Sequence, residues 1–226
     1  MFRIHKLRLE LRFDPILVCL RPNGSETRTW NNEIQAQFFG RLARARTKFQ
    51  YLRIQASYLA ERYPTVALML LERYFTLGEN FDIAQAYVVD QATAYLSLGD
   101  TDKAILSLQA ALIRERTNPN IRRTSWSQFA MLVAARRMQP HYEQALELLA
   151  QNQSQTIFPV DKSRWQAACA LIAAEQKDGP TAREHSVKAL EAAQLGHSGF
   201  RYHPKVGLVG PELTPLKEKL VQWSRL

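Results

Sequence analysis

The sequence has few cysteines, no long apolar run, and no enrichment in glycine or proline. Two cysteines in 226 residues exclude a disulfide-stapled scaffold and a cysteine-based zinc site. No apolar run approaches the roughly 20 residues that span a bilayer as a helix. Nine glycines and ten prolines are too few for a fibrous or low-complexity chain, and a hydrophobic share of 46% excludes disorder throughout. The chain is therefore one compact domain or a repeat array with extensions.

Positive charge is concentrated near the start of the chain. There are 30 Lys and Arg residues against 21 Asp and Glu, and residues 1–53 hold eleven of the basic residues but only four acidic ones. Such an excess can steer a protein toward nucleic acid, an acidic partner surface or an anionic membrane. It is equally the pattern of charges that flank a buried helical face. The basic patch that we single out consists of Arg41, Arg44, Arg46 and Lys48.

The first thirty residues form a distinct extension. Residues 2–13 alternate between apolar and charged side chains, which is the period of a half-buried strand, and 16–20 are a second short apolar run. The pattern over 1–30 is that of a β-hairpin, which needs support from the helical body or from a partner. Pairing with a second copy is one such solution, so a homo-oligomer stays open. Early charges at Arg3 and Lys6 do not fit a signal peptide, and we expect a cytoplasmic protein.

The pattern becomes helical from about residue 31. Apolar residues recur every three or four positions from Ile34 to Leu59, with Gly40 as the expected point of a break. Further on, helices alternate with short breakers that contain glycine or proline. Thr181 and Glu184 have the spacing of a capping box at the start of the last long helix. We therefore predict an all-α domain over residues 31–195.

The clearest internal unit covers residues 86–112. An aromatic residue precedes a glycine turn, and small and bulky residues follow at helical spacing: Tyr95, Gly99, Asp100, Ala104, Leu108 and Ala111. Gly99 can end a helix in the left-handed conformation, and Ala104 lets a second helix approach the first closely. The unit resembles the tetratricopeptide repeat, a helix–turn–helix unit that stacks into arrays. The resemblance implies a pair of packed antiparallel helices.

Three weaker units align with this one on alanines that we expect at the contact between paired helices. These are Ala67, Ala145 and Ala182, and with Ala104 the four positions are separated by 37, 41 and 37 residues. Each spacing exceeds the usual repeat of about 34 residues. The resemblance implies a TPR-like α-solenoid of about four helical hairpins over roughly residues 45–195. An ordinary helical bundle is the alternative.

Stacked helical hairpins expose a concave groove formed by their first helices. By resemblance, this groove would hold an extended or helical peptide of a partner protein. The partner-binding candidates are six polar residues that we assign to the first helices: Arg53, Asp90, Thr93, Ser127, Arg137 and Arg164. The alternative is that the neighbouring unit buries these positions.

The sequence contains no recognisable catalytic or metal-binding pattern. Its five histidines include no His-Glu-x-x-His motif and no close pair with metal-ligand spacing. The serines lack a Gly-x-Ser-x-Gly elbow, and no glycine-rich phosphate loop precedes a helix. We therefore expect a protein that is not an enzyme and has no cofactor and no metal.

The C-terminal segment, residues 196–226, cannot simply continue the array. Residues 196–211 combine glycine with aromatic and basic side chains, which predicts an ordered loop. Residues 213–226 predict a terminal helix with Leu216, Leu220 and Trp223 on one face. One interpretation is a cap over the last repeat. The other is a partner-binding loop, with Phe200, Arg201, Tyr202 and His203 as its candidate residues.

Taken together, these patterns favour an interaction scaffold that binds a protein or peptide through its helical-repeat surface. The alternative is a nucleic-acid-associated or regulatory protein that uses the basic N-terminal segment, because aromatic residues accompany its cations and can stack on bases. No known nucleic-acid-binding module is recognisable in the sequence. An enzyme of unrecognised type is the third and weakest option.

Overall fold

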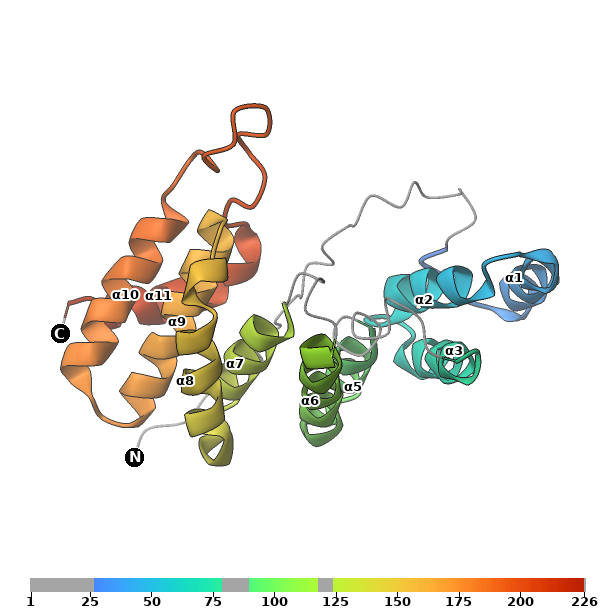
Figure 1. The fold of residues 1–226 in the computed structure, drawn as a ribbon, viewed down its shortest axis with the longest axis horizontal. Coiled ribbons are helices and arrows are strands. Elements are labelled where there is room, and N and C mark those ends of the chain that lie inside the picture. Colours follow the sequence, from blue (N-terminus) through green and yellow to red (C-terminus); the bar gives the residue numbers. More distant parts are fainter. Residues whose placement is uncertain (1–26, 79–89, 118–123, 226) are drawn as a thin grey trace. The chain divides into compact units, whose positions relative to one another are not determined.

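The computed structural model describes residues 27–78, 90–117 and 124–225, and in these ranges the fold is helical (Figure 1). Ten α-helices and several short 3-10 helices occur there, and these ranges contain no strand. The chain divides into two compact units at residue 125. We call residues 27–125 the N-terminal unit and residues 126–225 the C-terminal unit. The expected all-α class is confirmed, whereas the expected β-hairpin lies outside the described residues.

The N-terminal unit packs each helix against the next one along the chain. Its core lies mainly between the second and third helices, where fully buried leucines surround Tyr74. Burial of such side chains supplies about 1.5–3 kcal/mol each relative to exposure. The helices are α1 (Asn32–Arg44), α2 (Lys48–Leu59), α3 (Pro64–Thr76), α5 (Ala92–Ser97) and α6 (Thr101–Thr117).

The apolar stripe that begins at Ile34 is divided between two helices. The expected break at Gly40 does not occur, because α1 continues to Arg44. The chain turns at Ala45, whose extended backbone ends α1, and α2 begins at Lys48. A glycine in a helix interior costs only about 1 kcal/mol. Phe38 of the same helix packs against the Trp30 and Phe39 rings, and such aromatic contacts are stabilising.

The C-terminal unit is a series of helices in which α8, α9, α10 and α11 pack in sequence. Trp165 joins α9 to α8 by donating from Nε1 to the Leu149 carbonyl at 2.7 Å. Ser163 joins α9 to α10 by donating to the Ala189 carbonyl at 3.0 Å. The helices are α7 (Ser125–Ala135), α8 (Tyr142–Gln151), α9 (Pro159–Glu175), α10 (Gly179–Ala193) and α11 (Thr214–Trp223). Leu216 and Leu220 of α11 are buried, as expected of a terminal helix with one apolar face.

Three of the helices end in the same type of turn. After α5, α7 and α9 the chain places a single residue in the left-handed conformation: Gly99 (φ 80°), Arg137 (φ 56°) and Lys177 (φ 63°). At each turn the next amide donates back to the carbonyl five residues earlier, at 2.9–3.0 Å. This is the Schellman motif, which satisfies carbonyls at a helix end. The sequence predicts this turn only at Gly99, because the other two left-handed positions hold Arg137 and Lys177 instead of glycine.

The four aligned alanines occupy the same place in four helices. Ala67 of α3, Ala104 of α6, Ala145 of α8 and Ala182 of α10 are at most 1% exposed. α3 packs on α2, α6 on α5 and α10 on α9, so three of the alanines lie in the second helix of a packed pair. The predicted role of a small residue at a helix contact therefore agrees with their burial. In each of these three pairs a buried alanine thus stands at the fourth position of the second helix.

The predicted capping box at the start of α10 is wrong. The helix begins at Gly179, two residues before Thr181, and its N-cap is Asp178. The Asp178 carboxylate accepts the Thr181 amide at 3.1 Å. An acidic N-cap satisfies a helical amide better than a residue already inside the first turn. In the turn after α9, the left-handed Lys177 is followed by the N-cap Asp178. The turn before α6 has the same arrangement, with the left-handed Gly99 followed by Asp100, whose carboxylate accepts the Lys103 amide.

Candidate partner-binding surfaces

Three of the predicted groove residues lie together in the N-terminal unit. The Arg53 guanidinium on α2 is 4.0 Å from the carboxylate of Asp90, which lies two residues before the start of α5. The Asp90 side chain is fully buried and that of Arg53 is 12% exposed. Thr93 follows less than one turn later, and its hydroxyl oxygen is also buried. The cluster joins two helices from inside, so Asp90 is not presented on the surface.

The other three groove candidates belong to the C-terminal unit. Ser127 on α7 and Arg164 on α9 are half-buried, whereas Arg137 is exposed. Arg137 Nε lies 2.9 Å from the Glu175 carboxylate at the end of α9. Of the six candidates, Arg137 therefore presents the most accessible charge.

A buried phenol lies beside this ion pair. Tyr142, the first residue of α8, is 5% exposed, and its hydroxyl has no hydrogen-bond partner among the described residues. Burial raises the pKa of Tyr142, the Glu175 carboxylate raises it further, and Arg137 opposes both. Tyr142 is therefore a neutral phenol whose role is in packing at the start of α8.

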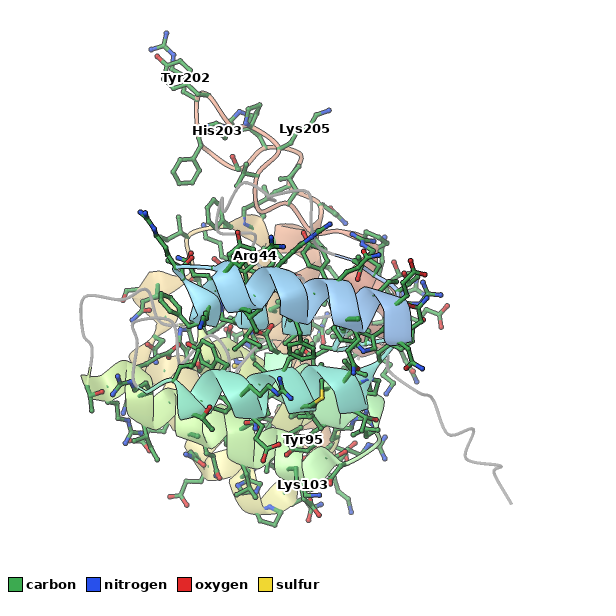
Figure 2. The ribbon with its side chains drawn as sticks, turned by 90° about the vertical axis from the view of Figure 1, so that its right-hand side faces the viewer. Arg44, Tyr95, Lys103, Tyr202, His203 and Lys205 are labelled. Carbon is green, nitrogen blue, oxygen red and sulfur yellow. The ribbon has the colours of Figure 1, made fainter. Side chains whose placement is uncertain are left out.

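The predicted basic patch lies where α1 meets α2. Arg41 and Arg44 are in the last turn of α1, Arg46 lies in the connection, and Lys48 opens α2. All four are exposed, and Arg44 Nε donates to the Gly40 carbonyl at 3.3 Å. Arg44 is labelled in Figure 2. No acidic residue occurs from 34 to 60 in the sequence, so nearby sequence positions do not neutralise the patch.

A loop between α10 and α11, residues 196–210, forms the most distinctive surface of the C-terminal unit; we call it the tail loop. Ser198 organises it from within. The Ser198 amide donates to the Pro204 carbonyl at 2.8 Å, and its hydroxyl donates to the His203 carbonyl at 2.7 Å. The same hydroxyl accepts the Phe200 amide at 3.2 Å. Three bonds to one small residue close the loop on itself, as expected for an ordered rather than a floppy segment.

The base of the tail loop is fastened to the start of α9. The Gly207 carbonyl accepts the Val160 amide at 2.9 Å. The Phe158 and Phe200 ring centroids are 5.3 Å apart. Because aromatic pairs at this distance attract, the ring contact adds to the backbone bond. The helix before α10 and the loop after it are therefore held together.

The tip of the tail loop carries aromatic and basic side chains in solvent. Phe200 is 43% exposed and Tyr202 is 79% exposed. The Arg201 guanidinium lies over the Tyr202 ring, 5.5 Å from its centroid. Figure 2 shows Tyr202, His203 and Lys205 on a loop that rises away from the helices. The four residues singled out from the sequence thus share one exposed tip.

Sequence reasoning missed the residues that hold this loop and part of its tip. Ser198 and Gly207 give the loop its shape, and Lys205 and Val206 extend its exposed surface. The sequence contains a signal for the tip, because no acidic residue occurs from 192 to 211. The packing of Gly207 on Phe158 has no such signal, since it joins positions far apart along the chain.

The titratable residues in the described ranges give little support to catalysis or metal binding. Burial raises the pKa of the Cys169 thiol to about 12, which removes its nucleophilic form at neutral pH. The His185 Nδ1 atom is 2.6 Å from the Gln166 Oε1 atom, and burial lowers the pKa of this histidine. In the part of the chain that the structure describes, no three His, Cys, Asp or Glu residues are grouped to hold a metal ion. None of its helices is long and apolar enough to cross a bilayer.

Comparison of the chain with protein-family models, with curated proteins and with solved structures gives no match in any of the three. The interpretation of these surfaces therefore rests on their own chemistry.

Proposed function

We propose that this chain is a non-enzymatic scaffold of tetratricopeptide-repeat type that binds a protein or peptide partner through its helical surface. The observation that carries the proposal is the shared construction of its helix pairs. The same left-handed turn follows α5, α7 and α9, and a fully buried alanine recurs in α3, α6, α8 and α10. Repeated hairpins stacked side by side create extended surfaces, which is their common use in proteins.

The accessible part of the proposed surface lies around the turn at Arg137. This guanidinium is exposed and belongs to the C-terminal unit, together with the half-buried Ser127 and Arg164. Arginine is enriched among residues that dominate protein interfaces, because its planar group pairs with carboxylates and stacks on aromatic rings. A partner segment with an acidic or aromatic residue fits this position.

The test is affinity capture of the tagged chain from its native cells, with half of the sample treated with nuclease. We expect a stoichiometric protein partner that survives nuclease and binds again when purified. Arg137→Gly removes the guanidinium and suits the left-handed turn, so it should weaken binding about tenfold or more. Lys177→Gly is the matched control, because it makes the same change at the equivalent turn after α9. Equal binding by wild type and Arg137→Gly contradicts a partner site at this turn.

A second function, association with nucleic acid, is favoured by one separate feature. The basic patch places four exposed cations within eight residues where α1 meets α2, in a stretch without acidic residues. Binding through phosphates falls steeply with salt, and each lost contact reduces the slope by about one. Oligonucleotide binding should then weaken, and its salt slope flatten, when Arg41, Arg44, Arg46 and Lys48 are all changed to Gln. Unchanged binding by that variant would contradict this function for the patch.

A further inference from the structure

The tail loop displays a continuous exposed surface that the proposed scaffold does not use. Every residue from 199 to 206 is exposed, and the loop stands away from the helices in Figure 2. The exposed apolar surface comes from Phe200 (43% exposed), Tyr202 (79%) and Val206 (47%). Aromatic side chains left in water at a projecting tip are unfavourable unless something covers them, so the tip points to a binding role.

The charge of this surface has one sign. Arg201 and Lys205 are exposed cations that alternate with the apolar side chains. No carboxylate occurs from residue 192 to 211. The ligand of this loop is therefore anionic and must also accommodate apolar side chains.

The shape of the loop selects among anionic ligands. A projecting tip does not enclose a nucleic-acid strand, and its two permanent cations would neutralise few phosphates. Nucleic acid would also leave Val206 without a partner. A lipid surface fits all of these properties, because tyrosine and phenylalanine enter the interfacial layer while Arg and Lys remain at the headgroups.

We propose that the tail loop is a peripheral membrane-docking element, which inserts Tyr202, Val206 and the exposed part of Phe200 into the interfacial layer of an anionic bilayer, while the rest of the Phe200 ring stays packed on Phe158. Arg201 and Lys205 contact the headgroups, and the Arg201 guanidinium over the Tyr202 ring carries charge and apolar surface into the interface together. Two cations and three apolar side chains give weak and reversible attachment, as for a single lipid anchor.

The loop is prepared for such insertion. The bonds of Ser198 close its tip, and the Gly207 carbonyl bond to the Val160 amide fixes its base. A loop that is already ordered loses little conformational freedom on binding, so more of its contact energy appears as affinity. Docking through this loop does not depend on the protein partner proposed above, so either proposal can fail alone.

The test is co-sedimentation of the full chain with vesicles of phosphatidylcholine alone or with about one third phosphatidylserine. We expect binding to the anionic vesicles that weakens as salt is raised. Arg201→Gln and Lys205→Gln should each reduce partitioning about fivefold. Tyr202→Ser should reduce it to a similar or greater degree, and should leave the remaining salt dependence unchanged.

Two matched control variants each remove an exposed apolar or cationic side chain that lies outside the tail loop. Leu106→Ser on α6 removes an apolar side chain that is 61% exposed, and Lys217→Gln on α11 removes an exposed cation near the loop in sequence. Neither should change partitioning. In a separate measurement, Tyr202→Trp should give a blue-shifted fluorescence difference from wild type when anionic vesicles are added.

Two results would overturn the proposal. One is equal partitioning by wild type and the three loop variants, with no spectral shift for Tyr202→Trp. The other is loss of single-stranded oligonucleotide binding in the loop variants without any vesicle binding by wild type, which would make the loop a nucleic-acid contact.

Discussion

Gly207 lies directly against Phe158, so that a Cβ at this position would overlap Cβ and Cγ of the phenylalanine. The glycine is also in the left-handed conformation, with φ 68°. Its carbonyl accepts the Val160 amide, so the backbone cannot move away without losing this bond. The contact fixes where the tail loop leaves the helices.

Gly207→Ala should therefore destabilise the C-terminal unit. Steric overlap and backbone strain act together, and we expect a loss of about 2 kcal/mol in the free energy of unfolding, measured by urea denaturation. Gly196→Ala is the matched control in the same loop, because a Cβ there meets nothing within 4 Å. Phe158→Ala should recover part of the loss when combined with Gly207→Ala. Strictly additive losses in the double variant would contradict the steric explanation.

Lys177→Gly should stabilise the protein. Lys177 holds a left-handed conformation (φ 63°) that costs a side chain about 1 kcal/mol and costs glycine little. We expect a gain of about 1 kcal/mol by urea or thermal unfolding. Lys177→Ala serves as the control, because it removes the same charge but keeps the Cβ, and it should bring no gain.

The same argument predicts the opposite change at the equivalent turn. Gly99→Ala should cost about 1 kcal/mol, since Gly99 has φ 80° and open space around it, so that only the backbone is affected. At Arg137 the gain from glycine should be smaller than at Lys177, because Arg137 also pairs with Glu175 at 2.9 Å. A stabilising effect of Gly99→Ala would show that the turn is not left-handed in solution.

The recurring alanines should tolerate no larger side chain. Ala145 on α8 is fully buried, and Ala145→Leu should destabilise by about 1–3 kcal/mol because the added atoms enter a packed contact. Ala150 is exposed on the same helix, so Ala150→Leu is a matched control with an expected effect within about 0.5 kcal/mol. Similar effects of the two changes would argue against a close helix contact at Ala145.

The sequence predicted the helix pairs well where a residue type has one local role. Gly99 marked a turn because glycine favours the left-handed region, and the aligned alanines marked buried positions in four helices. Arg137 and Lys177 adopt the same turn without a glycine signal. There the strain is balanced by the bonds of the Schellman motif and by tertiary packing, which a local pattern does not reveal.

The candidate sites were predicted less completely, because accessibility depends on tertiary structure. The sequence pattern predicts Asp90 in a groove-lining first helix, yet its carboxylate is buried beside Arg53. Conversely, the aromatic and basic tip around Tyr202 was found from composition alone, since glycine-rich sequence with aromatic residues indicates an ordered loop. The residues that shape that loop act through contacts distant in sequence and gave no local signal.

Cys169 should make the protein less stable at alkaline pH. Burial raises the pKa of its thiol in the folded state to about 12, whereas a thiol in an unfolded chain titrates near 8.5. Above this lower value the unfolded state loses a proton that the folded state keeps, so the free energy of unfolding falls as pH rises. The fall is about 1.4 kcal/mol per pH unit between the two values.

Because other groups also titrate in this range, the quantity to measure is the difference in the free energy of unfolding between wild type and Cys169→Ala. It is obtained by urea denaturation under reducing conditions from pH 7 to 10. That difference should be constant below about pH 8 and should then change in favour of the alanine variant. A constant difference over the whole range, or rapid labelling of Cys169 in the folded protein, would mean that the thiol is accessible to water and is not buried among the alanines of α9.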